Sequence, residues 1–165
     1  MTRHHASDPL KDYSVVVPVV VQWGDQDAFG HVNNTVFLRW FEVGRIAYFS
    51  EIRMPHDAQG AGRGPILASL TCNFRRQVTF PDEVRVGSRL ARIGTSSLVL
   101  EHLVVSLGLG AVVADGTSTV VNYDYAAGKS RPVPDELRRA IEAMESANRG
   151  LVNDVRPEGD PVGPE

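Results

Sequence analysis

The amino-acid sequence predicts an α+β domain in which a curved antiparallel sheet of five strands wraps around one long buried helix. Three observations support this fold class: a β-branched strand near the N-terminus, a helix with a wide apolar stripe, and four further strands. Such a helix can be buried between these strands only if the sheet curls around it. The 165 residues and the 42% hydrophobic content suit a single domain with its own core.

The first strand is predicted from Tyr13 to Gln22, where valine dominates. Pro18 lies within it and cannot donate to a sheet ladder, so we expect this strand at an edge or at a bulge. The long helix is predicted to begin at Asn33 and Asn34, which are good capping residues, and to end near Ile52. Its apolar residues recur at helical spacing and predict deep burial: Val36, Phe37, Trp40, Phe41, Gly44, Ala47 and Tyr48.

Four strands and a closing helix follow. A segment rich in glycine and polar residues, His56 to Gly64, predicts a mobile loop after the long helix. Alternation of side chains and turn signals such as Gly94-Thr95 and Gly108-Leu109-Gly110 predict four antiparallel strands. These strands are expected over residues 66–75, 83–93, 97–107 and 111–125. Proline at the start and acids in the first turn predict a helix over 134–148.

The domain is predicted to span residues 13–149. Residues 1–12 are expected to form a flexible N-terminal segment, and the tail at 150–165 is expected to be disordered because it is rich in proline, glycine and acids. The long strand edge left by such a sheet favours a homodimer or a homotetramer, since pairing removes an aggregation hazard.

Composition excludes several classes of function. A formal net charge of -3 argues against nucleic acid as a partner. No apolar stretch approaches a membrane span, and the polar start is not followed by a signal-peptide core. The single cysteine, Cys72, cannot form an internal disulfide, so we expect a reducing, cytoplasmic location.

Polar residues are concentrated just ahead of the long helix, over residues 22–34. By residue chemistry alone, the segment is equally compatible with a loop that makes turns and caps the helix. A calcium loop is excluded because Phe29 replaces a ligand and Val36 stands where the closing glutamate belongs. No Cys/His spacing predicts a zinc site, so no metal is expected.

The same segment carries a family resemblance. The pattern Asp25-x-Asp27-x-x-Gly30-His31-Val32-Asn33-Asn34, followed by Trp40, Glu42 and Arg45, resembles the 4-hydroxybenzoyl-CoA thioesterase-like family. The likeness continues through Phe74-Arg75-Arg76, Pro81-Asp82-Glu83-Val84, Gly94-x-x-Ser97 and Asp124 to Pro132. It implies a hot-dog fold and an enzyme that hydrolyses an acyl-coenzyme A thioester to free acid and coenzyme A. It implies no cofactor, because coenzyme A is part of the substrate.

The resemblance implies that Asp27 is the catalytic carboxylate and that the backbone N–H of Asn34 polarises the thioester carbonyl. A carboxylate can attack this carbonyl directly or can deprotonate an attacking water, and the sequence leaves both routes open. Either route develops an oxyanion, which the unpaired N–H groups at a helix start are suited to stabilise.

Other candidates surround these two groups. Asp25 would share a side with Asp27 in an extended segment, so it is the alternative base or a residue that tunes Asp27, and Asp27 is preferred as the base. Gly30, His31 and Asn33 are expected as site neighbours. Glu42 is the reserve acid on the helix, although its spacing from Arg45 favours a buried ion pair instead.

Coenzyme A brings phosphates, for which Arg75 and Arg76 are the candidate partners, and Ser96 and Ser97 are candidate hydrogen-bonding groups. Two other functions stay open. A hot-dog hydratase or dehydratase would need a histidine on the helix, which offers only Glu42. A non-catalytic module that binds acyl-CoA or an acyl carrier protein would need the same pocket without a reactive carboxylate.

Overall fold

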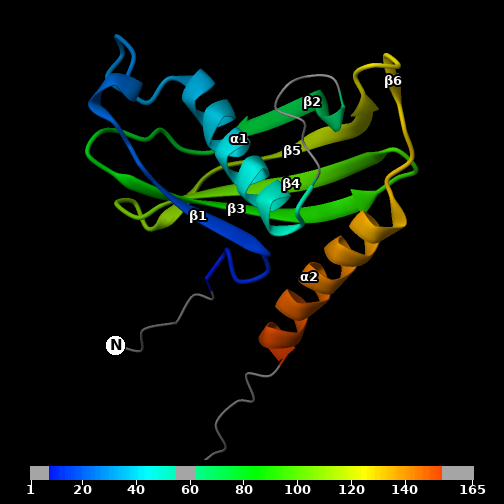
Figure 1. Cartoon of the computed structure of the whole chain (residues 1–165). Coiled ribbons are helices and arrows are strands. Elements are labelled where there is room, and N and C mark those ends of the chain that lie inside the picture. Colours follow the sequence, from blue (N-terminus) through cyan, green and yellow to red (C-terminus); the bar gives the residue numbers. More distant parts are fainter. Residues whose placement is uncertain (1–7, 55–61, 154–165) are drawn as a thin grey trace, which may run out of the picture.

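The computed structural model describes residues 8–54 and 62–153 and confirms the α+β hot-dog fold (Figure 1). Figure 1 shows α1 lying across one face of a curved sheet, with α2 beyond the end of α1. The elements are β1 (Val15–Val20), η1 (Trp23–Asp25), α1 (Asn34–Glu51), β2 (Arg63–Phe74), β3 (Glu83–Ile93), β4 (Ser97–Ser106), β5 (Ala111–Asp124), β6 (Lys129–Ser130) and α2 (Asp135–Asn153).

The sheet is antiparallel, and its strands are arranged in the order β1-β3-β4-β5-β2. These are the five predicted strands, and the two-residue β6 adds a sixth by pairing with the end of β5. The predicted edge position of Pro18 is confirmed, because among the described residues β1 pairs with β3 alone. At the other edge of the described sheet, the 12-residue β2 pairs with β5 alone.

The apolar stripe of α1 is buried as predicted. Phe37, Trp40 and Phe41 pack with valines of β3, β4 and β5 in one cluster, under the first half of the helix. Gly116 on β5 permits this packing, since a Cβ there would overlap the Thr71 carbonyl oxygen and the Phe41 ring. The aromatic residues of α1 are therefore mainly core residues.

The second half of α1 packs against α2. Tyr48 and Ile52 share a cluster with Leu137 and Ile141 of α2, as the apolar face predicted for the closing helix requires. Glu145 of α2 is buried inside this contact. Its carboxylate accepts hydrogen bonds from the Ser14 hydroxyl (2.6 Å), the Tyr48 hydroxyl (2.8 Å) and the Leu90 N–H (2.8 Å). This carboxylate ties α2 to α1, to β3 and to the segment before β1.

A second buried polar group lies under the middle of α1. His102 of β4 is bonded through Nδ1 to the Ser88 hydroxyl at 2.8 Å and through Nε2 to the Ser118 hydroxyl at 2.7 Å. Its ring stacks on Phe41. Burial, aided by the positive charge of Arg45, lowers the pKa of His102 to about 3. This imidazole is therefore neutral in the folded protein at neutral pH.

Three predicted boundaries are wrong. Leu10, which was assigned to the flexible N-terminal segment, is packed: it is 3% exposed and lies over Gly87, whose missing side chain leaves room for it. Arg63 and Gly64 begin β2 and do not belong to the preceding loop. The helix α2 runs past 148 to Asn153, into the predicted tail, because no proline stands before Pro157 to stop it.

The rest of these predicted segments, residues 1–7, 55–61 and 154–165, lies outside the described residues. Within the described part of the chain, neither helix is long and apolar enough to cross a membrane.

Candidate active site

The segment between η1 and α1 forms a short hairpin. The Asn33 N–H donates to the Asp25 carbonyl oxygen at 2.9 Å, and the Asp27 N–H donates to the His31 carbonyl oxygen at 2.9 Å. Between these pairs, Gln26 and Val32 form an antiparallel bridge. The tip turns at Gly30, whose φ of 78° is accessible to glycine at little cost. The hairpin holds Asp27 on one arm and delivers the other arm into α1.

Asp27 is half-buried at the start of the hairpin tip. Its Oδ1 accepts a hydrogen bond from the Phe29 N–H at 2.8 Å. Within the described residues, its second carboxylate oxygen accepts no hydrogen bond. The carboxylate is therefore oriented by one bond and keeps one oxygen for chemistry.

The capping of α1 leaves one particular N–H unused. The Asn33 side chain accepts from the Thr35 N–H at 2.9 Å and from the Thr35 hydroxyl at 2.8 Å. The Val36 N–H donates to the Asn33 carbonyl oxygen at 2.9 Å. Between them, the Asn34 N–H donates to no group in the part of the chain that the structure describes. A helix start with a free N–H is a favourable place for an anion.

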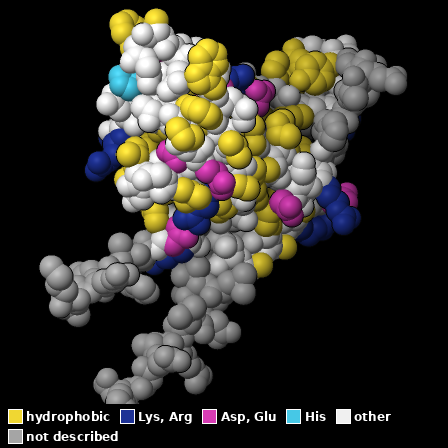
Figure 2. All heavy atoms as spheres, turned by 90° about the vertical axis from the view of Figure 1, so that its left-hand side faces the viewer, with side chains coloured by type: hydrophobic (Ala, Val, Ile, Leu, Met, Phe, Trp, Pro, Cys, Tyr) yellow, Lys and Arg dark blue, Asp and Glu magenta, His cyan; other side chains and the backbone are white. Residues whose placement is uncertain are grey.

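A groove of about 570 Å³ brings these groups together. It is lined by Asp27, Phe29, His31, Val32, Asn34, Phe37, Phe74, Arg75, Arg76 and Gln77. Figure 2 faces the end of the sheet that carries the hairpin and shows hydrophobic side chains gathered over it. Phe29 at the hairpin tip is 84% exposed. The groove therefore combines a carboxylate, a free helix N–H, aromatic walls and two arginines.

Asp25 is not arranged as the sequence led us to expect. It closes η1, so it does not share a side with Asp27, and it is 9% exposed. Its Oδ1 accepts from Arg39 Nη2 at 2.9 Å, and its Oδ2 accepts from the Gln22 N–H at 2.8 Å. Both oxygens are occupied and the residue does not line the groove, so it is poorly placed to act as a base.

The two arginines of the groove, Arg75 and Arg76, differ in whether they form an ion pair. Arg75 is hydrogen-bonded to Asp115, and this bond is the main reason why the pKa of the Asp115 carboxyl is lowered. Arg76 makes no ion pair with a described residue, so it is the freer cation at the groove.

Ser96 and Ser97 do not reach this groove within one chain. Ser97 pairs with Val121, near one end of β5. Phe74, which lines the groove, pairs with Ala114 near the other end of β5.

Glu42 is also outside the groove, and the predicted buried ion pair is only half correct. Arg45 Nη2 lies 3.8 Å from Glu42 Oε1, and the Arg45 side chain is 8% exposed, whereas that of Glu42 is 60% exposed. Because Glu42 points to solvent, only the Arg45 guanidinium is buried. This burial lowers the pKa of Arg45.

The sequence did not identify Phe29, Phe74 and Gln77 as groove residues. Phe74 ends β2, and its side chain meets Phe37 of α1 edge-on at 5.4 Å between ring centroids. The alternation of the strand placed Phe74 on a defined face, but only the sheet order places that face beside the helix start.

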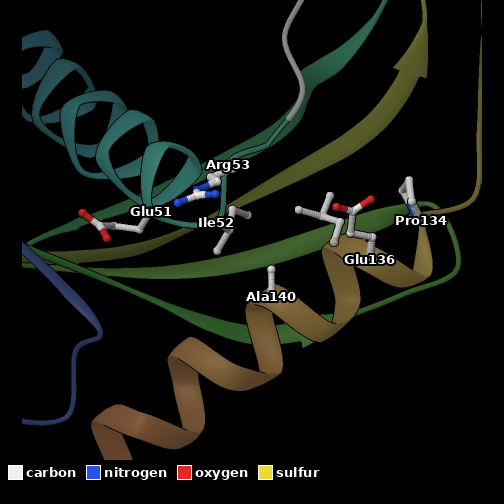
Figure 3. A pocket seen from close by; sticks show the side chains of 7 residues that line it. Glu51, Ile52, Arg53, Pro134, Glu136 and Ala140 are labelled. Atoms are coloured by element: carbon white, nitrogen blue, oxygen red, sulfur yellow. The ribbon is translucent and has the colours of Figure 1, made fainter.

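A second cleft, of about 420 Å³, lies between the end of α1 and the start of α2 (Figure 3). Figure 3 shows Glu51, Ile52 and Arg53 on one side and Pro134, Glu136 and Ala140 on the other. It is remote in the fold from the hairpin. Among the described residues, no group of three His, Cys, Asp or Glu side chains is placed to hold a metal ion.

Most of the chain matches a known family. The Thioesterase-like superfamily matches residues 21–141, from the end of β1 to α2. The chain belongs to this superfamily. It is a thioester hydrolase by family and fold.

Relatives of known structure or function agree with this assignment. A thioesterase from Thermus thermophilus, solved with coenzyme A and Zn, is 36% identical with a TM-score of 0.71, and the match covers 82% of this chain and 96% of that one. The PA2801 protein from Pseudomonas aeruginosa is 36% identical with a TM-score of 0.69, over 76% and 96% of the two chains. The betainyl-CoA thioesterase of P. aeruginosa is 25% identical over 136 residues, 81% of this chain and 84% of the relative.

Proposed function

We propose that this thioesterase hydrolyses an acyl-coenzyme A thioester to a free acid and coenzyme A, with Asp27 as the catalytic carboxylate. The observation that carries the proposal is that Asp27 and the start of α1, where the Asn34 N–H has no partner among the described residues, line the same groove. The coenzyme A complex of the Thermus relative and the activity of the betainyl-CoA relative support coenzyme A as the carrier.

The proposed reaction begins with the thioester carbonyl directed at the Asn34 N–H. The free oxygen of Asp27 attacks the carbonyl carbon to give a mixed anhydride that water then hydrolyses, or it takes a proton from a water that attacks. In both routes the carbonyl oxygen becomes an oxyanion, and the N–H at the positive end of α1 stabilises it. A thiolate is a good leaving group, so the site needs no strong general acid.

The lining of the groove suits the two ends of such a substrate. Phe29, Phe37 and Phe74 offer apolar surface beside the reacting carbonyl. Arg76 offers a free cation for the phosphates of coenzyme A, whereas Arg75 is held by Asp115. Ser96 and Ser97 can take part only if a second copy brings them to the groove.

We also propose that the protein acts as a homodimer or a homotetramer. The edge strand β2 carries exposed apolar side chains, including Ile66, Leu67 and Phe74, and an unpaired edge of this length is normally covered. Sedimentation velocity tests this, since a monomer at all concentrations would contradict it. Because coenzyme A esters are intracellular metabolites, the proposal places the enzyme in the cytoplasm, with water as the only co-reactant and no cofactor.

The decisive experiment measures free-thiol release from aliphatic and aromatic acyl-CoA esters. We expect the wild type to turn over at least one ester and Asp27→Asn to lose about 10²- to 10⁴-fold in kcat, as removal of a general base or nucleophile does. Asp12→Asn, an exposed aspartate before β1, is the matched control and should keep full activity.

Either of two outcomes would contradict the proposal. Ligand binding without turnover in the wild type would favour a binding module. Full activity of a folded Asp27→Asn would show that the Asp27 carboxylate has no catalytic role, since Glu42 and Asp25 both lie outside the groove.

A further inference from the structure

The ion pair between Asp25 and Arg39 lies at the base of the catalytic hairpin, and neither residue lines the groove. Building on the proposed function, we infer that this pair is a positioning device. It holds the Asp27 carboxylate in place relative to the Asn34 N–H, and it sets the rate of turnover without touching the substrate.

Asp25 connects the segments that carry the two catalytic groups. Its carboxylate accepts from Arg39 of α1 at 2.9 Å and from the Gln22 N–H at 2.8 Å, and its carbonyl oxygen accepts from the Asn33 N–H at 2.9 Å. Asn33 directly precedes Asn34, and Asp25 stands two residues before Asp27. A shift of Asp25 relative to α1 therefore changes the separation of the carboxylate and the N–H.

The two arms of the hairpin are held differently. The second arm is anchored to the chain beyond β2, because the Val32 N–H donates to the Val78 carbonyl oxygen at 2.8 Å. The first arm has a weaker anchor there, a 3.1 Å bond from the Phe80 N–H to the Gln26 side chain. Its side-chain link to α1 is the ion pair of Asp25 with Arg39. Without Arg39, the arm that carries Asp27 loses this link, and a displacement of about 1 Å can cost on the order of 10²-fold in rate.

The same pair contributes little to global stability. The Arg39 side chain is 65% exposed, so solvent screens its charge, whereas the Asp25 side chain is 11% exposed and keeps the Gln22 N–H as a partner when Arg39 is removed. The positioning role therefore predicts a loss of turnover in a protein whose melting temperature is almost unchanged. A merely structural role would predict a lower melting temperature with little change in turnover.

The test uses the full chain and four variants: Arg39→Met, Arg39→Lys, Asp25→Asn and the double variant Asp25→Asn with Arg39→Met. We expect Arg39→Met and Asp25→Asn each to lower kcat about tenfold with KM within about twofold of the wild type. The double variant should lose no more than Asp25→Asn alone, because both changes remove one interaction. Arg39→Lys should recover most of the activity.

The matched control is Arg89→Met, which breaks the 2.8 Å ion pair between Arg89 and Glu101 on strands β3 and β4 and should leave kcat unchanged. Additive losses, a rise in KM with kcat intact, or an unchanged kcat in Arg39→Met would each overturn the inference.

A second readout does not depend on catalysis. Amide hydrogen exchange at Asn33, which donates to the Asp25 carbonyl oxygen, should become faster in Arg39→Met and stay unchanged in Arg89→Met. If the wild type hydrolyses no thioester, the proposed function fails while the exchange rate still reports on the pair. If the wild type is active and Asn33 exchanges equally in both proteins, the positioning role alone fails.

Discussion

The two ends of α1 treat their polar groups in opposite ways. At its start, the Asn34 N–H has no partner among the described residues, and Asp27 keeps one free oxygen beside an open groove. At its other end, Tyr48 donates to the buried Glu145 carboxylate, which accepts two further hydrogen bonds. One end leaves hydrogen-bonding capacity for a ligand, whereas near the other end the Tyr48 hydroxyl and the Glu145 carboxylate are paired within the protein.

This difference separates activity from stability on a single helix. An unsatisfied group costs little where water reaches it, but it costs about 1–3 kcal/mol where it is buried. The groups at the exposed start can therefore remain available for a substrate, while the groups at the buried end must pair. We expect substitutions at the start to change rates and substitutions at the other end to change the free energy of unfolding.

Among the substitutions that compare the two ends of α1, Asn34→Pro should have the largest effect. Asn34 is the first residue of α1, and Asn33 has an extended backbone with φ -60° and ψ 141°, so proline fits there and removes the N–H together with the Asn34 side chain. We expect kcat to fall about 10²- to 10³-fold, as for loss of one oxyanion donor, with little change in melting temperature. Steady-state thiol release and thermal melts measure both quantities.

Asn34→Ala is the matched variant, because it deletes the side chain and keeps the N–H. The ratio of the two kcat values isolates the N–H. If Asn34→Pro and Asn34→Ala were equally active, the N–H would have no catalytic role.

At the buried end, Glu145→Leu should lower the free energy of unfolding by about 3 kcal/mol. The substitution leaves the buried Tyr48 hydroxyl and the partly buried Leu90 N–H without their acceptor. Urea unfolding measures the change, and Glu142→Leu, at an exposed position of the same helix, is the control and should stay within about 0.5 kcal/mol of the wild type.

Thiol release at 25 °C should remain close to that of the wild type in folded Glu145→Leu. A large loss of kcat at unchanged stability would break the proposed separation between the two ends of the helix.

The sequence was sufficient for the features that depend on nearby residues. Spacing within α1 predicted its bounds and its buried aromatics, and alternation with turn signals predicted the strands. The segment that carries Asp27 and Asn34 could also be located, because these residues are only seven positions apart. Short-range geometry is set mostly by local chemistry, so patterns of residue type are informative there.

The features that could not be predicted from the sequence depend on contacts between distant segments of the chain. Ser14 and Glu145 are 131 positions apart, and nothing in either neighbourhood predicts their hydrogen bond. Ser97 was expected near the groove, but the antiparallel register carries it to the far end of β5. Asp25 was expected beside Asp27, but η1 turns it toward Arg39. In each case tertiary packing decides between several local possibilities.

The smallest expected effect concerns His102: a change in how steeply the free energy of unfolding depends on pH. Its folded pKa of about 3 lies below the value near 6.5 of an exposed histidine, so the unfolded chain binds more protons between these limits. The contribution of His102 to the free energy of unfolding is at its maximum above about pH 6.5. It falls by about 1.4 kcal/mol per pH unit below this value. Aspartates whose pKa is lowered in the fold, such as Asp115, add their losses only below about pH 4.

Urea unfolding between about pH 4.5 and pH 8 therefore isolates the histidine. His102→Gln removes the titrating ring and can still hydrogen-bond to the serines, so we expect it to be less stable at pH 8 and to show a much flatter pH dependence. If the free energies of unfolding of the wild type and of His102→Gln changed in parallel with pH, the buried imidazole would not control acid stability. A flattened curve with normal thiol release would show that the polar core beneath α1 supports the fold independently of the open site at its start.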